Sequence, residues 1–222
     1  MSRNKTAFAV LLLVVLVPLA SLARKKPLPS ALQRVGVITA ILYNTSLVRQ
    51  SNPAVSVDNG TELAWTDTLR TDGNGRVRVR LDNSSNLSVG SDSELHIVTY
   101  DPQSHRAVVE LSSGRLWINS SRVTNDQRIE VRTPGATVTA SDPDFGVDAS
   151  VPGQVRFFAL KGRLRVTPNA SEGNPIDCEP GETVMIKNGM LSRGPWPADE
   201  VQAATLRNTV DPEEPAPYSP FP

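Results

Sequence analysis

Short stretches that alternate apolar and polar residues, separated by glycine-containing turns, fill the chain from Val35 to Met190 and are densest between Val131 and Gly189. In Leu160–Val166, for example, apolar and basic residues alternate around a central glycine. Alternation with period two is typical of a strand with one face in water. Turn signals recur roughly every eight to twelve residues, without long amphipathic helical patterns between them. We therefore predict an all-β domain over residues 35–190, folded as a twisted β-sandwich or a short β-helix-like stack of short strands.

The first residues have the pattern of a targeting segment. Two basic residues precede the apolar stretch Ala7–Leu19, and small residues follow up to Ala23. This order is typical of a secretory signal peptide, although the apolar stretch is also close to the lower length limit of a membrane span. We predict that residues 1–23 are a signal peptide or a membrane anchor, with residues 7–23 as the anchoring part. The protein would then be exported, to the periplasm or the cell exterior, free or held at the inner membrane. The basic residues 24–26 leave a cytoplasm-facing anchor as an alternative.

The regions outside the predicted β domain differ in composition. Residues 24–34 are basic and proline-containing and are predicted to be a linker. Residues 191–210 contain good helix formers, which predict a short helix centred on 197–208. Residues 211–222 are so rich in proline that both helix and sheet are excluded, and we predict a disordered tail.

The overall charge argues against a nucleic-acid partner. The 23 basic residues are cancelled by 23 acidic ones, so no global field attracts an anionic polymer. A local basic stripe is present at Arg76, Arg78 and Arg80. Because these residues alternate with apolar ones, we interpret the stripe as the wet face of a half-buried strand.

The sequence contains few groups suited to catalysis. Cys178 is the only cysteine, which excludes an internal disulfide and predicts an unreactive thiol between acidic neighbours. Glu94 and His96 share a strand face and could begin a metal site together with His105 or the acidic cluster 142–148. No complete ligand set or nucleophile motif is evident, so we predict a protein that is not an enzyme and holds no cofactor or metal.

Aromatic residues could form either a core or a binding platform. Trp65, Trp117 and Trp196 lie in separate predicted strands and a terminal segment, so packing in the core or under a lid is favoured over a sugar-stacking surface. In the pair Phe157–Phe158, alternation directs one ring into the core and the other to an edge or interface.

The order of strands and turns resembles the FecR domain, the extracytoplasmic part of bacterial iron-citrate signalling regulators. The best matches are the family's "v-x-T-P-x-A", "v-x-e-G-x-V-x-V" and "a-G-e" patterns, and weaker ones precede them. They correspond to Val131–Ala136, Leu160–Val166 and Pro180–Glu182, with the weaker ones at Asn59–Val77, Leu81–Val89 and Leu111–Leu116. The resemblance implies an extracytoplasmic all-β module concerned with signalling.

The clearest departure from the family pattern lies in its best-matching half. The family's "R-G-T-x-F" falls on Ser141–Phe145, where only the phenylalanine is kept and Asp142-Pro143 replaces the Gly-Thr turn. A reworked turn on a conserved scaffold is a candidate functional loop. We predict that this loop comprises Asp142, Pro143, Asp144 and Phe145.

These observations favour a non-enzymatic, exported, FecR-like module that binds an envelope protein, an envelope polymer or a ligand. Few residues precede the apolar stretch, so we expect no cytoplasmic anti-sigma segment. One alternative is a metal-dependent β-barrel enzyme using Glu94, His96, His105 or the 142–148 cluster. Another is a structural envelope protein that assembles through strand edges or the proline-rich tail.

Overall fold

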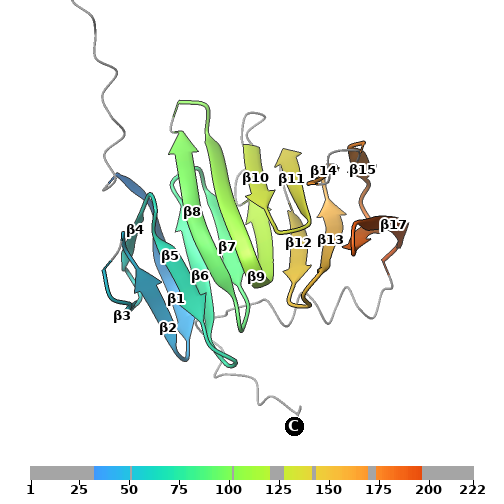
Figure 1. Cartoon of the computed structure of the whole chain (residues 1–222). Coiled ribbons are helices and arrows are strands. Elements are labelled where there is room, and N and C mark those ends of the chain that lie inside the picture. Colours follow the sequence, from blue (N-terminus) through green and yellow to red (C-terminus); the bar gives the residue numbers. More distant parts are fainter. Residues whose placement is uncertain are drawn as a thin grey trace, which may run out of the picture. The chain divides into compact units, whose positions relative to one another are not determined.

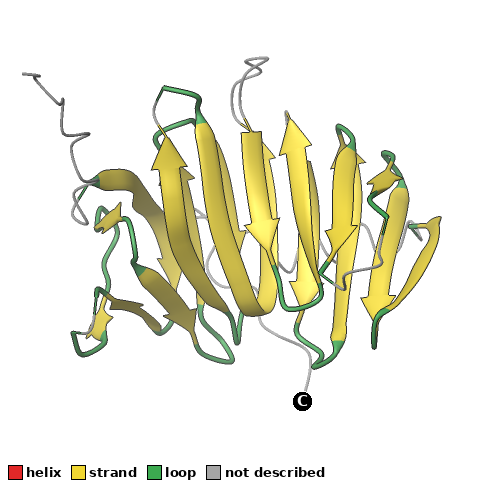
Figure 2. Cartoon of the chain, turned by 45° about the horizontal axis from the view of Figure 1, so that its top comes forward, coloured by secondary structure: helices red, strands yellow, loops and turns green. Residues whose placement is uncertain are grey.

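The protein was analysed as a computed structural model, which describes residues 33–50, 52–101, 103–120, 128–141, 144–169 and 174–196. These residues form strands joined by turns, with no helix among them (Figure 2). The predicted all-β class is therefore confirmed. The predicted signal or anchor segment, most of the linker and the tail lie outside the described residues. No helix in the described part of the chain is long and apolar enough to cross a membrane.

The strands form two hydrogen-bonded layers, which we name sheet A and sheet B (Figure 1). In order across the layer, sheet A contains β4 (Glu62–Ala64), β1 (Arg34–Leu42), β6 (Arg76–Leu81), β7 (Ser85–Val89), β9 (Arg106–Ser120), β12 (Asp144–Ala149), β13 (Gln154–Lys161), β16 (Glu182–Lys187) and β17 (Met190–Pro195). Sheet B contains β3 (Val55–Ser56), β2 (Thr45–Val48), β5 (Thr68–Thr71), β8 (Glu94–Asp101), the first half of β9, β10 (Arg128–Arg132), β11 (Ala136–Ser141), β14 (Leu164–Pro168) and β15 (Ile176–Cys178).

Strand β9 belongs to both layers. Its first half pairs with β8 and β10 in sheet B, and its second half pairs with β7 and β12 in sheet A. The change of layer occurs at Gly114, which has a φ of +89°. A Cβ atom at this position would lie 2.5 Å from the Cα atom of Ser93, so the close approach of the segments around Ser93 and Gly114 requires glycine.

The core lies between the two sheets and is built by the alternation seen in the sequence. In β6, Val77, Val79 and Leu81 are buried and the arginines between them face outward, as predicted for the basic stripe. The inward residues of both sheets belong to one continuous apolar cluster. Burial of these side chains is the main force that holds the layers together.

Successive pairs of strands after β9 alternate between the layers. The hairpins β10–β11 and β14–β15 lie in sheet B, whereas β12–β13 and β16–β17 lie in sheet A. Among the described pairings, only β9–β10 is parallel. A β-helix stacks its coils through parallel pairs, so this arrangement is a sandwich rather than a β-helix. The layers also do not close on themselves as a barrel, contrary to the barrel alternative.

The C-terminal end of the β domain differs from the prediction. Residues 190–195 form β17, paired with β16, where the sequence indicated that a helical segment begins at residue 191. The hairpin turn at Asn188 and Gly189, both with positive φ, directs the chain back along β16. Residues 197–208, on which the predicted helix was centred, lie outside the described residues.

Candidate binding surface on sheet B

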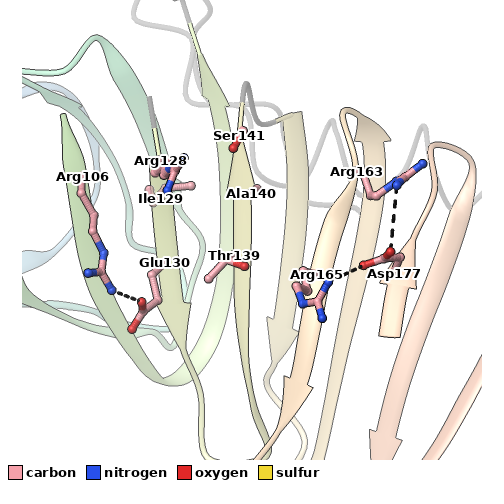
Figure 3. Close-up of a pocket in the computed structure, with 10 residues that line it drawn as sticks. All are labelled: Arg106, Arg128, Ile129, Glu130, Thr139, Ala140, Ser141, Arg163, Arg165 and Asp177. Carbon is pink, nitrogen blue, oxygen red and sulfur yellow. Dashed lines mark hydrogen bonds and ion pairs between the residues drawn. The ribbon is translucent and has the colours of Figure 1, made fainter. Parts of the chain in front are cut away.

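A groove of about 570 Å³ lies on the outer face of sheet B (Figure 3). Its floor is β11, whose outward side chains are the small Thr139 and Ser141. Long side chains from the neighbouring strands rise on both sides. One wall comes from β9 and β10 and contains Arg106, Arg128 and Glu130. The other comes from β14, the turn before it and β15, and contains Arg163, Arg165 and Asp177. Four arginines against two carboxylates give the groove lining a net positive charge.

Strand register places the groove residues in rows across the sheet. Arg128 of β10 is the Cα partner of Arg106 on β9 and of Ser141 on β11. Ser141 and Arg163 each lie one residue beyond the last β11–β14 pair, so they share this level. We call this set, Arg106, Arg128, Ser141 and Arg163, the arginine row. The next row contains Glu130, Thr139, Arg165 and Asp177.

Each carboxylate in the groove is held by two arginines. Glu130 accepts hydrogen bonds from Arg106 and from Arg132. Burial opposes the ionisation of Glu130, but these hydrogen bonds outweigh burial and lower the pKa of its carboxyl group. Asp177 lies 4.0 Å from Arg163 and 3.8 Å from Arg165. The Glu130 carboxylate therefore stays charged, and the contacts of Glu130 and Asp177 orient the guanidinium groups around the groove.

Arg128 differs from the other arginines of the groove. It is exposed, and no ion pair joins its guanidinium group to a carboxylate of the described residues. Its in-register neighbour Arg106 carries the same charge. Among the described residues, Arg128 is thus a cationic group of the groove without a carboxylate partner.

The outer face of sheet A carries an aromatic cluster over β9 and β13. Trp117 and Phe158 point outward from β9 and β13, and Trp196 lies against both, with ring centroids 6.0 Å and 4.8 Å away. All three rings are buried. Gly146 makes room for this packing, because a Cβ atom there would lie 2.8 Å from the Trp117 ring. Two of the three tryptophans therefore pack together as buried groups, and their faces are not free for a sugar.

Comparison with known proteins finds a family match over part of the chain. Residues 67–165, from the start of β5 into β14, match the family model described as FecR protein. Over this stretch the chain is similar to a FecR domain, as the sequence pattern predicted. The match includes both walls and the floor of the groove except Asp177, which follows it. No curated protein matches the sequence.

Two crystal structures of a protein from Parabacteroides distasonis, described as a candidate anti-sigma factor, share the fold. Each is 18% identical in sequence with a TM-score of 0.53, and each alignment covers 61% of this chain. The chain spans 63% and 62% of the length of those two proteins. At this level of identity the likeness shows a common fold and nothing further.

Of the four residues of the candidate loop, the structure describes Asp144 and Phe145, which have different roles. Phe145 is a fully buried core residue, so its role is packing. Asp144 lies at the start of β12 and accepts a hydrogen bond of 2.9 Å from the indole nitrogen of Trp117. Burial raises the pKa of Asp144, and the Trp117 hydrogen bond opposes this change. Asp142 and Pro143 lie outside the described residues. Asp144 therefore supports the aromatic packing of sheet A, and the role predicted for the loop as a whole stays a prediction.

The residues considered for a metal site are engaged separately. Glu94 pairs with Arg70 at 2.8 Å, and the Nδ1 atom of His96 lies 2.9 Å from the Thr68 hydroxyl. His105 lies in the turn between β8 and β9, at the far end of that hairpin from His96. In the part of the chain that the structure describes, no three His, Cys, Asp or Glu side chains are grouped to hold a metal ion.

Cys178 is buried at the end of β15. Burial, with a smaller contribution from the charge of Glu182, raises the pKa of its thiol to about 11. The thiol is therefore protonated at neutral pH, in line with the prediction of an unreactive cysteine.

The sequence did not identify the arginine row. The local signals of this row are the alternations Arg128-Ile-Glu-Val-Arg132 and Arg163-Leu-Arg165, which are typical of any strand face exposed to solvent. The residues come from three strands and from the turn before β14, and their shared level depends on register between strands that are far apart in sequence. The parallel pairing of β9 with β10 is the step that brings Arg106 to Arg128.

Proposed function

We propose that this FecR-like protein is a non-enzymatic, extracytoplasmic sensing module that binds a protein partner through the outer face of sheet B. The observation that carries the proposal is the arginine-lined groove on that face. The opposite outer face carries the Trp117–Phe158–Trp196 cluster, so the two faces are not equivalent. The FecR family match and the candidate anti-sigma factors of similar fold support a role in signalling.

A rigid sheet face suits such a role. Binding residues held on paired strands lose little conformational freedom when a partner docks, which lowers the entropic cost of association. Arginine is also enriched where protein interfaces contribute most of their binding energy, because its guanidinium group forms several directed hydrogen bonds. An extracytoplasmic location is supported by the sequence pattern of residues 1–23.

Site-specific photocrosslinking in whole cells tests the proposal. A photoreactive amino acid placed at Thr139, on the floor of the groove, should crosslink to a partner protein in the envelope fraction. The matched control is the same substitution at Arg80, an exposed residue on β6 in sheet A. A crosslink from Thr139 and none from Arg80 is expected. Equal crosslinking from both positions, or a protein found only in the cytoplasm, would contradict the proposal.

A further inference from the structure

We infer that the arginine row is a recognition site for a single carboxylate group, presented by an Asp or Glu side chain of the partner protein. This inference rests on the proposed function and names the chemistry by which the partner is recognised. The row contains Arg106, Arg128, Ser141 and Arg163.

The geometry of the row fits one anionic group above Ser141. Neighbouring strands lie about 4.8 Å apart, so Arg128 and Arg163 flank Ser141 at about that distance on either side of the β11 backbone. Both arginines have long side chains, whereas Ser141 is short and leaves space above it (Figure 3). A carboxylate in this space would accept hydrogen bonds from two guanidinium groups and from the Ser141 hydroxyl.

Within the described residues, the row sets two arginines side by side, and an anionic group would offset their like charges. Arg106 and Arg128 are Cα partners on adjacent strands, and like charges directly opposite each other destabilise a sheet. Glu130 neutralises Arg106, but Arg128 has no carboxylate partner among the described residues. Unfavourable interactions of this kind often mark binding sites, because a residue that binding requires is kept even where another residue would make the folded protein more stable.

The other arginines of the row are oriented in advance. Glu130 holds Arg106, while Glu179 holds Arg163 at 2.8 Å and Asp177 contacts it at 4.0 Å. A guanidinium group that is already fixed loses less side-chain entropy on binding than a free one. The second-row carboxylates Glu130 and Asp177, together with Glu179, therefore orient these two arginines for the ligand.

The same carboxylates favour a protein partner over a polyanionic chain. A polymer with one charge per repeat that followed the groove along β11 would place its next charge near Glu130 and Asp177, one row away. Residues on the same face of a strand are about 6.8 Å apart, which is too close for like charges to be well screened. A protein can instead present one carboxylate over the arginine row and neutral or basic groups over the second row.

The test uses the purified full chain labelled with ¹⁵N and three probes at equal ionic strength. These are the peptide acetyl-Ser-Ser-Glu-Ser-Ser-amide, the same peptide with glutamine, and tetragalacturonate. The glutamate peptide should shift the Nε–Hε signals of Arg128 and Arg163 in a saturable way, with a dissociation constant on the order of millimolar. The glutamine peptide should leave them unchanged, and tetragalacturonate should bind no more tightly than the glutamate peptide.

Two variants with the same change of charge complete the test. Arg128→Ser should weaken binding of the glutamate peptide at least tenfold and raise the unfolding midpoint of the free protein. Arg80→Ser, on the other sheet, should change the affinity less than twofold. The inference is overturned if the glutamate peptide gives no saturable shift, or if Arg128→Ser binds it as well as the natural protein does. If tetragalacturonate binds at least tenfold more tightly than the glutamate peptide, the inference that the partner is a protein is wrong.

Failure of this inference can be told apart from failure of the proposed function. If Arg128→Ser loses the peptide but the Thr139 crosslink persists at full yield, the partner does not depend on the arginine row and the inference is wrong. The proposed function would then still stand.

Discussion

Single residues in this domain illustrate how burial decides the strength of an ion pair. Asp67 is fully buried, and its carboxylate accepts two hydrogen bonds from Arg49, at 2.9 Å and 2.8 Å, and one of 2.7 Å from the Ala64 backbone. Asp67 directly precedes β5 and Arg49 directly follows β2, so their pair joins the ends of these two strands. Arg70 and Glu94 form an exposed pair nearby at 2.8 Å. The two pairs have similar distances, but the buried pair is joined by two hydrogen bonds and the exposed pair by one.

Arg49→Ala should therefore lower the free energy of unfolding by roughly 2–3 kcal/mol, because it leaves the Asp67 carboxylate buried without its counterion. Arg49 is 36% exposed, which places the value below that of a fully buried pair. Arg70→Ala is the matched control and should cost less than about 1 kcal/mol. Urea unfolding of both variants measures the difference. Equal costs would show that burial of Asp67 does not determine the strength of its pair.

A second residue-scale prediction concerns pH. The pKa of Asp144 is raised on folding, so the folded protein binds this proton more readily than the unfolded chain and ionised Asp144 opposes folding. The penalty is present at neutral pH and disappears as the pH falls through the raised pKa toward the ordinary value of 3.8.

Asp144→Asn removes this ionisation and keeps an oxygen that can accept the Trp117 hydrogen bond. The variant should be more stable than the natural protein at neutral pH, and its advantage should shrink as the pH approaches 3.8. Parallel urea titrations of the two proteins across this range give the difference. An advantage that does not change with pH would contradict the assignment.

At the scale of elements, the outer strands of both sheets are poor templates for pairing. β3 and β4 contain two and three residues, and β15 contains three. β17 is longer but places Arg193 on the inward side, where it pairs with Glu182 at 2.6 Å. Short edges and inward charges are devices that prevent strands from adding to a sheet. They argue against the alternative of a structural protein that assembles through its strand edges.

Arg193→Val should test this interpretation of β17. The substitution removes the inward charge and leaves a more apolar edge, so the protein should form dimers or larger species at concentrations where the natural protein is monomeric. Light scattering after size-exclusion chromatography provides the measurement. Met190→Val, at a position of β17 that is 75% exposed, is the control and should not change the mass. If both variants stay monomeric, the ion pair is not what protects the edge.

At the scale of the whole β domain, β9 is the connection between the layers. It contributes residues to both sheets and borders the groove on one face and the aromatic cluster on the other. The change of layer at Gly114 depends on a conformation and a space that only glycine provides. A disturbance at this position should therefore affect both sheets together.

Gly114→Ala should destabilise the domain more than Gly60→Ala. Gly60 has a nearly identical φ of +90°, but no atom lies within 4 Å of the added Cβ, so its substitution measures the conformational penalty alone, about 1 kcal/mol. At Gly114 the clash with Ser93 should add about 1–3 kcal/mol. Urea unfolding of both variants tests this difference. Equal losses would mean that Ser93 can move aside at little cost.

The sequence predicted the strands and their faces well. Alternation showed that Val77 and Val79 would be buried, and that the two rings of Phe157–Phe158 would take different environments. It was wrong about the start of the helical segment, because residues 191–195 pair with β16 and their strand pattern is weak. It also chose the 142–145 loop as the candidate site and did not identify the groove. Of the described part of that loop, Phe145 is core and Asp144 supports Trp117.

The alternating stretches with glycine turns thus determined, without any structure, that the chain is all-β and which side of each strand faces water. This information is local, because a period of two fixes the face of a side chain whatever strand lies beside it. The tertiary structure alone decided which strands are neighbours and in which register. Pairing of β9 with β10 and of β11 with β14 is non-local, and it sets Arg106, Arg128, Ser141 and Arg163 in one row. A binding surface made of several strands is a property of that pairing.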